Sequence, residues 1–151
     1  MNMRFIPTNI HGLVDHGVAS TLLAAPAIFD LPSGSPEGIV PRAVGGVEAI
    51  YASVTDYEMS LKNVVPLPVH LVLDVIGGAT LALVPQLTGA RRRGVQHWLP
   101  HLGFGLFEIG MAICTKTEPP QTPERRARAV KKLAKSALRA KVVKDVANVL
   151  S

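Results

Sequence analysis

Cysteine and charge are both scarce in this chain of 151 residues. The single cysteine, Cys114, excludes a disulfide scaffold, since such folds depend on several paired cysteines. Charged residues make up only 18% of the chain and hydrophobic residues 48%, which excludes an intrinsically disordered protein. Gly103 and Gly105 lack the strand, turn and helix context of a phosphate-binding loop. The sequence therefore predicts one ordered, apolar domain without a nucleotide-binding motif.

Hydrophobic residues are concentrated in four blocks, each close to the roughly 17 to 25 residues that cross a bilayer as a helix. The blocks are Ile10–Leu31, Ile39–Thr55, Val64–Leu87 and Val95–Thr115. A soluble four-helix bundle is the alternative, but its helices need polar outer faces, and none is found around residues 19–28 and 75–84. We expect an all-α, integral membrane four-helix bundle over residues 1–118.

The segments between the blocks are short, so neighbouring helices should run antiparallel and both ends of the bundle should lie on one side of the membrane. Lysine and arginine are more numerous on that side, which predicts that both termini lie in the cytoplasm. The triplet Arg91, Arg92 and Arg93, before the fourth block, opposes this orientation. The predicted location is the bacterial inner membrane, with several passes.

Residues 119–151 differ sharply in composition from the apolar blocks. From Pro123 onward, basic residues alternate with alanine, valine and leucine at helical spacing. The basic face of this predicted helix consists of Arg128, Lys131, Lys132, Lys135 and Arg139. Such an amphipathic helix is typical of segments that bind anionic lipid headgroups, and a solvated tail is the alternative. Nucleic-acid binding is not predicted, because no aromatic residue is interleaved with the basic ones.

The apolar blocks contain an internal repeat. A shift of 59 residues places His11 on His70 and Asp15 on Asp74. With one additional residue, Glu48 falls on Glu108. Residues 4–58 and 63–118 are thus interpreted as two copies of a two-helix hairpin. Because each hairpin returns to its starting side, the copies share one topology, as in parallel repeats related by an axis along the membrane normal.

Each copy begins with the same pattern: a histidine, an aspartate four residues later and a proline fifteen residues after the histidine. These helices read FIPTNIHGLVDHGVASTLLAAPAIF and VPLPVHLVLDVIGGATLALVPQL. Residues 4–118 resemble the SPW-repeat family and related small four-helix membrane proteins of bacteria. The name-giving Ser-Pro-Trp is replaced here by Ala25-Pro26-Ala27 and Val84-Pro85-Gln86. The resemblance implies a four-helix membrane fold and no particular activity.

Six ionisable side chains recur within the blocks and are the candidate site residues: His11, Asp15, His70, Asp74, Glu48 and Glu108. Charged groups are costly within a bilayer, so these side chains should face the bundle interior. A histidine and an aspartate four residues apart share one face of a helix. Glu48 lies near the middle of its block and His11 near the start of its own, so the sequence does not place them at one depth.

Three interpretations of these residues stay open. The first is a structural network in which interhelical hydrogen bonds fix the helix register, in a protein without enzyme activity. The second is a metal site for iron, manganese or zinc. The third is haem ligation by the two histidines, or proton transfer. The sequence favours the structural interpretation and predicts no cofactor and no catalytic residue.

Two further expectations concern surfaces. Tyr57 and Trp98 lie at or just outside the block ends, where aromatic residues anchor helices at the membrane interface. Paired glycines allow helices to approach closely, either within the chain or in a homo-oligomer. These pairs are Gly45 and Gly46, Gly77 and Gly78, and Gly103 and Gly105. The predicted partners are therefore the lipid bilayer and a second copy of the chain.

Overall fold

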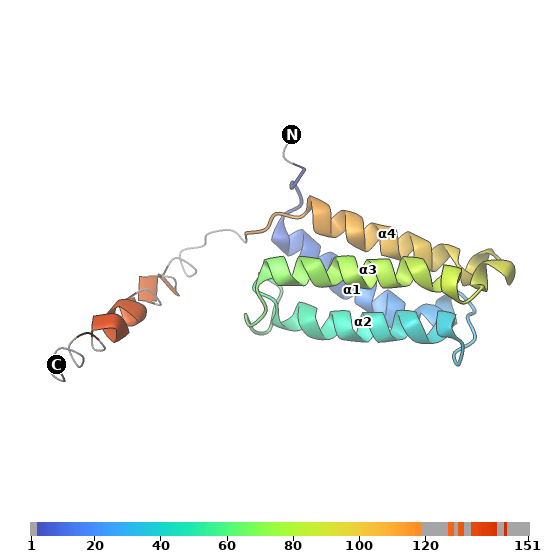
Figure 1. Ribbon diagram of the computed structural model, residues 1–151, viewed down its shortest axis with the longest axis horizontal. Helices are drawn as coiled ribbons and strands as arrows, with labels where there is room; N and C mark the ends of the chain where they lie inside the picture. The colour runs from blue at the N-terminus through green and yellow to red at the C-terminus, as the bar shows by residue number, and fades with distance from the viewer. Residues whose placement is uncertain (1–2, 119–126, 129, 132–133, 142–143, 145–151) are drawn as a thin grey trace. The chain divides into compact units, whose positions relative to one another are not determined.

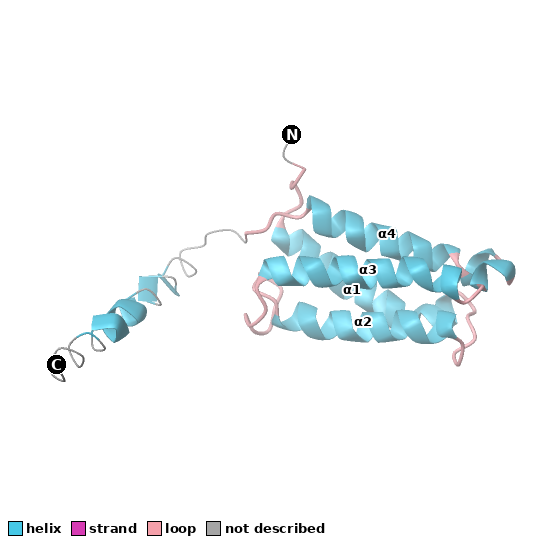
Figure 2. Cartoon of the chain, in the orientation of Figure 1, coloured by secondary structure: helices cyan, strands magenta, loops and turns pink. Residues whose placement is uncertain are grey.

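The computed structural model describes residues 3–118, 127–128, 130–131, 134–141 and 144. Residues 3–118 contain four long helices, labelled in Figure 1: α1 (Thr8–Ile28), α2 (Pro36–Val54), α3 (Leu67–Leu87) and α4 (Leu99–Cys114). Two 3-10 turns, η1 (Ala90–Arg92) and η2 (Val95–His97), lie between α3 and α4. Figure 2 shows helices and loops but no strand among the described residues, which confirms the all-α prediction.

The predicted apolar blocks coincide with the four helices apart from their ends. A proline lies at or next to each helix start, where its missing N–H and fixed φ are tolerated; these prolines are Pro7, Pro36, Pro68 and Pro100. The fourth helix begins at Leu99, after the start of its apolar block at Val95, because Gly94 adopts a φ of 132° and residues 95–97 form a separate turn.

The helices pack as two antiparallel hairpins. α1 lies against α2 and α3 lies against α4, whereas contact between the hairpins is less extensive and involves mainly α2 and α3. The start of α1, the α2–α3 connection and the end of α4 lie at one end of the bundle, here called the terminal end (Figure 1). There the Ile6 amide donates to the Cys114 carbonyl at 3.0 Å, and the Lys116 amide donates to the Ile6 carbonyl at 3.0 Å. This is the up-down-up-down order expected from the short loops.

Glycines bring the helices of each hairpin close together. A Cβ atom on Gly45 of α2 would lie 2.7 Å from Cβ of Leu22 in α1. A Cβ atom on Gly78 of α3 would lie 2.5 Å from the carbonyl oxygen of Gly105 in α4. By contrast, a Cβ on Gly103 would meet no heavy atom of the described chain within 4 Å. Gly45, Gly78 and Gly105 thus serve packing within the chain, one of the two roles expected for the glycine pairs.

The bundle has ionisable residues in its interior and large apolar side chains on its surface, the reverse of a water-soluble bundle. Eight acidic residues and histidines in the described chain are buried: His11, Asp15, Glu37, Glu48, His70, Asp74, His101 and Glu108. Large apolar side chains of all four helices are exposed, among them Leu13, Ile50, Val72 and Leu106. Among the described residues, α3 is the one helix long and apolar enough to cross a membrane, which by itself is weak evidence of membrane association.

Residues 120–151 form a second unit, described here by itself. The chain divides between Pro119 and Pro120, one residue beyond the predicted boundary. Residues 134–141 are helical and exposed, as are Arg128 and Lys131. Four members of the predicted basic face, Arg128, Lys131, Lys135 and Arg139, therefore lie in helical segments. Lys132 lies outside the described residues.

Candidate functional site

Four of the predicted candidates meet between α1 and α3, near the terminal end. His11 and Asp15 lie about one turn apart on α1, and His70 and Asp74 lie about one turn apart on α3. All four are buried, and one potential ligand atom from each lies within 4.8 Å of the other three. They form the one group of this kind in the described part of the chain. We refer to these four residues as the His–Asp cluster.

The two histidines of the cluster face each other through their Nε2 atoms, which are 3.2 Å apart. Nε2 of His11 lies 3.1 Å from Oδ2 of Asp74, and Nε2 of His70 lies 3.0 Å from Oδ2 of Asp15. Within each helix, the histidine and the aspartate are 3.4 Å apart. Each histidine thus contacts both aspartates, and the shorter contact crosses between the helices.

Two threonines fix the orientation of these imidazoles. Oγ1 of Thr55 lies 2.8 Å from Nδ1 of His70, and Oγ1 of Thr115 lies 2.9 Å from Nδ1 of His11. Each threonine hydroxyl also donates to the backbone carbonyl four residues earlier, at 2.7 Å. A hydroxyl has only one hydrogen, so each Oγ1 must accept from the imidazole. Both Nδ1 atoms therefore carry a hydrogen.

This tautomer determines what the imidazoles present to the centre of the cluster. With the hydrogen on Nδ1, a neutral imidazole presents a lone pair at Nε2. The centre is therefore surrounded by two nitrogen lone pairs and by carboxylate oxygens, all of which are electron-pair donors. Donors buried in this way require protons or a metal ion between them.

The same threonines connect the two hairpins. Thr55 follows α2 and accepts from the histidine of α3, whereas Thr115 follows α4 and accepts from the histidine of α1. At these positions the backbone forms two parallel bridges, Thr55 with Val65 and Ile6 with Thr115. The two halves of the bundle thus make matching contacts with each other.

Two tyrosines hold the aspartates of the cluster. The hydroxyl of Tyr51 donates to Oδ1 of Asp74 at 2.8 Å, and that of Tyr57 donates to Oδ2 of Asp15 at 3.4 Å, a weaker bond. Tyr57 is only 1% exposed, so its expected place at a membrane interface is wrong. Its ring lies against Gly12, where an added Cβ would come within 2.7 Å of a ring carbon. The lack of a side chain at Gly12 therefore leaves room for the Tyr57 ring on this turn of α1.

The two predicted glutamates lie beside the His–Asp cluster rather than within it. Glu48 and Glu108 line a small cavity of about 10 Å³ together with His11, Asp15 and Asp74. The two glutamates are 2% and 5% exposed. Within the described chain, neither carboxylate oxygen of Glu108 has a hydrogen-bond partner, and Oε2 of Glu48 has none. The candidate residues therefore form a contiguous polar interior, with the glutamates adjoining the cluster.

A second polar group lies at the opposite end of the bundle and was not expected from the sequence. The carboxylate of Glu37, in the first turn of α2, is fully buried and forms an ion pair with Arg93. Nδ1 of His97 lies 3.5 Å from the same carboxylate, and Nε2 of His101 donates to the Glu37 carbonyl at 2.9 Å. These contacts tie η2 and the start of α4 to α2.

Apolar side chains separate the two polar groups along the bundle. Val18 and Leu22 of α1 pack with Leu81 of α3 in a buried cluster. Partly buried apolar residues surround this cluster: Val14, Val40, Val44 and Phe104. The polar interior of the described bundle is thus interrupted between its two ends.

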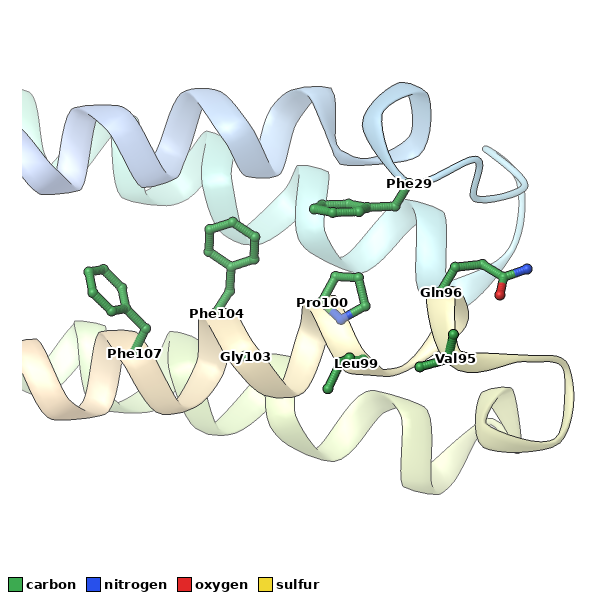
Figure 3. A pocket seen from close by; sticks show the side chains of 8 residues that line it. All are labelled: Phe29, Val95, Gln96, Leu99, Pro100, Gly103, Phe104 and Phe107. Atoms are coloured by element: carbon green, nitrogen blue, oxygen red, sulfur yellow. The ribbon is translucent and has the colours of Figure 1, made fainter.

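An apolar groove opens along α4, and Figure 3 shows its lining. The lining residues are Phe29, Val95, Gln96, Leu99, Pro100, Gly103, Phe104 and Phe107. The rings of Phe29 and Phe104 meet edge to face, with centroids 6.3 Å apart. Phe107 lines both this groove and the cavity beside the His–Asp cluster. Its side chain therefore lies between the polar interior and the groove.

No protein-family model, curated protein or solved structure matches this chain. The resemblance to the SPW-repeat family therefore stays a prediction.

Proposed function

We propose that this protein is a membrane-embedded four-helix bundle that binds one divalent transition-metal ion in the His–Asp cluster. The observation that carries the proposal is the convergence of four buried donor groups whose imidazole tautomer is set by Thr55 and Thr115. Histidines that bind a metal almost always donate their second ring N–H to a neighbouring acceptor. Both histidines here make such a bond.

The spacing of the donors suits a tetrahedral ion. Metal–ligand bonds of about 2.0–2.1 Å separate neighbouring ligands of a tetrahedron by about 3.3 Å. In the cluster, the two Nε2 atoms are 3.2 Å apart and the four histidine–aspartate distances lie between 3.0 and 3.4 Å. Two imidazoles and two carboxylates suit zinc or iron by ligand type, and zinc favours the tetrahedral arrangement. Zn²⁺ is therefore the ion that we infer.

Haem does not fit the same histidines. Two axial imidazoles on one haem iron lie on opposite faces of the porphyrin, with their nitrogens about 4 Å apart, twice a typical metal–nitrogen bond. The Nε2 atoms of His11 and His70 are only 3.2 Å apart, and both aspartates contact them. Protons are the other cations that could occupy the centre, and metal analysis distinguishes the two cases.

The proposed ion also provides a structural role like the one predicted from the sequence. Its ligands come from α1 and α3, which belong to different hairpins. Contacts between the hairpins are less extensive than contacts within each hairpin. An ion held by both would therefore link the two halves and fix their register. The proposal includes no catalytic step.

We infer a membrane location from the inside-out distribution of residues. Buried ionisable groups and exposed apolar side chains on all four helices suit a bundle surrounded by lipid. In this proposal the duplicated hairpin is a multi-pass protein of the bacterial inner membrane, with its terminal end toward the cytoplasm. The basic helical tail then binds anionic lipid headgroups on that side. The inferred family is the SPW-repeat-like group.

Metal analysis of the full-length protein, purified in detergent, tests the metal proposal. We expect about one zinc ion per chain, and its loss in the variants His11→Ala and His70→Ala. His16→Ala is the matched control, because His16 lies on the same helix as His11 but outside the cluster, and it should retain the ion. Co²⁺ bound in place of zinc should give the intense visible absorption of a tetrahedral site. Protein that binds neither Zn²⁺, Fe²⁺ nor Co²⁺ would contradict the proposal and assign the central charge to protons.

Solubility tests the membrane part separately. We expect the protein to sediment with membranes, to resist extraction at alkaline pH and to aggregate when detergent is removed. A monodisperse protein in plain buffer would contradict the inferred membrane location while leaving the metal site to be judged by the metal analysis.

A further inference from the structure

We propose that Glu48 and Glu108 form a second divalent-cation site, in the cavity that adjoins the His–Asp cluster. This inference rests on the proposed metal-binding function and extends it from one ion to two. The geometry that points to it is the cavity that the two glutamates line together with both aspartates of the His–Asp cluster.

The balance of charge supports a second cation. Four carboxylates are buried at this level of the bundle: those of Asp15, Asp74, Glu48 and Glu108. One divalent ion in the His–Asp cluster compensates the charge of two. Among the described residues that line the cavity, none is a lysine or an arginine. Because an uncompensated carboxylate is strongly unfavourable in an apolar interior, the two glutamates must either hold protons or share a cation, and the test below distinguishes the two cases.

Three of the four carboxylate oxygens of the two glutamates also lack a hydrogen-bond partner within the described chain. In the described chain, both carboxylate oxygens of Glu108 and Oε2 of Glu48 have no hydrogen-bond partner, although both residues are more than nine-tenths buried. Gly77 of α3 leaves space for the Glu108 carboxylate, since a Cβ there would lie 3.2 Å from Oε2. Buried polar atoms are nearly always paired. Three unpaired oxygens on one cavity are what a cation bound there would pair.

The ligands available at this second position are carboxylate oxygens. Such ligands suit hard divalent ions such as Mn²⁺ and Mg²⁺, whereas the first position offers two imidazoles. The cavity of about 10 Å³ has room for little more than one ion or one water molecule. The two ions of a two-metal site lie about 3.5–4 Å apart. Mn²⁺ is the probe of choice, because two ions at this separation are magnetically coupled.

The test uses full-length protein in detergent, stripped with a chelator and then loaded with Mn²⁺ alone. We expect two Mn²⁺ ions per chain in the wild type, with a paramagnetic resonance spectrum broadened by coupling. Glu48→Gln and Glu108→Gln should each bind one ion and show an uncoupled spectrum. Glu58→Gln is the matched control, since Glu58 is an exposed glutamate that accepts from the Thr8 hydroxyl, and it should bind two.

The outcomes separate this inference from the function on which it rests. One Mn²⁺ in the wild type and in both glutamine variants would overturn the second site and leave the first intact. Absence of both Mn²⁺ and Zn²⁺ from every protein would overturn both proposals. Each glutamine variant is also titrated with Zn²⁺, which should still bind at the His–Asp cluster. If a glutamine variant stays helical but no longer binds Zn²⁺, the glutamates and the His–Asp cluster form a single site, which would contradict the two-ion arrangement.

Discussion

Oγ1 of Thr115 lies 2.9 Å from Nδ1 of His11, although the two residues belong to different hairpins. The hydrogen of that hydroxyl is donated to the Met111 carbonyl at 2.7 Å, so the imidazole must be the donor in the contact. A threonine outside the His–Asp cluster thus decides which nitrogen of His11 faces the carboxylates.

Replacement of Thr115 by valine should weaken metal binding without removing a ligand. Valine has nearly the shape of threonine but leaves Nδ1 of His11 without its acceptor. We expect a loss of about 10- to 100-fold in affinity, measured by Co²⁺ titration, and recovery in Thr115→Ser. Thr80→Val is the control, because Thr80 makes the same type of bond to Ile76 on an exposed face. An equal loss in both valine variants would show a general helix effect.

The two tyrosines should contribute unequally to stability. Tyr51→Phe removes a bond of 2.8 Å to Asp74, whereas Tyr57→Phe removes a bond of 3.4 Å to Asp15. A hydrogen bond to a charged group contributes about 1.5–3 kcal/mol, and the longer bond should contribute less. The free energy of unfolding in detergent, measured for both variants, checks the order. The reverse order would mean that Tyr57 holds the cluster more firmly than its distance indicates.

Close contact between α3 and α4 should make Gly105 intolerant of substitution. An added Cβ would collide with the carbonyl oxygen of Gly78 and lie 2.9 Å from the amide nitrogen of Ala82. We expect Gly105→Ala to lower the free energy of unfolding by about 1–3 kcal/mol. Gly103→Ala, on the exposed side of the same helix, should be neutral or stabilising by up to about 1 kcal/mol. Similar losses at both positions would contradict the packing argument.

Acid should release the proposed ion, because protons and the metal compete for the Nε2 atoms of His11 and His70. The affinity should fall by about tenfold per pH unit for each proton displaced, hence up to about a hundredfold for two. Thermal stabilisation by the metal should accordingly be present at neutral pH and lost as the pH falls. Calorimetric titrations in buffers of different ionisation enthalpy count the displaced protons. An affinity that is unchanged from about pH 7 to pH 5 would argue against direct histidine ligation.

The tail should respond to lipid charge. A peptide of residues 122–151 should gain helicity on vesicles that contain anionic lipids and not on neutral vesicles. Circular dichroism measures the gain, and added salt should reduce it. A version with Lys131 and Lys135 replaced by glutamine should bind more weakly. Equal helicity on both kinds of vesicle would contradict an electrostatic role for the basic face.

The convergence of His11, Asp15, His70 and Asp74 could be predicted because it depends on two properties visible in a sequence. Side chains four residues apart share a helix face, and a repeat places equivalent residues at equivalent depths. The helices themselves could be located from their hydropathy, apart from ends that depend on local backbone conformation, as at Gly94.

Other parts of the site depend on how the hairpins dock and could not be predicted in this way. Thr55 and Thr115 lie one residue beyond the ends of α2 and α4. The register that places Glu48 on Glu108 also places Thr55 on Thr115, but it does not show which histidine each threonine contacts. Tyr57 looks like a residue of a polar loop, and only the turn after α2 brings it onto Asp15. Glu37 looks like an exposed acid in a first helical turn, yet the chain after α3 brings Arg93 onto it.

Because each threonine accepts from the histidine of the other hairpin, neither hairpin alone contains a complete set of ligands and supporting acceptors. Docking of the halves and creation of the central site are consequently a single event. During biosynthesis the chain has no such centre until its fourth helix is in place and Thr115 has reached His11. Loss of the central site and separation of the two hairpins should likewise occur together when the protein unfolds.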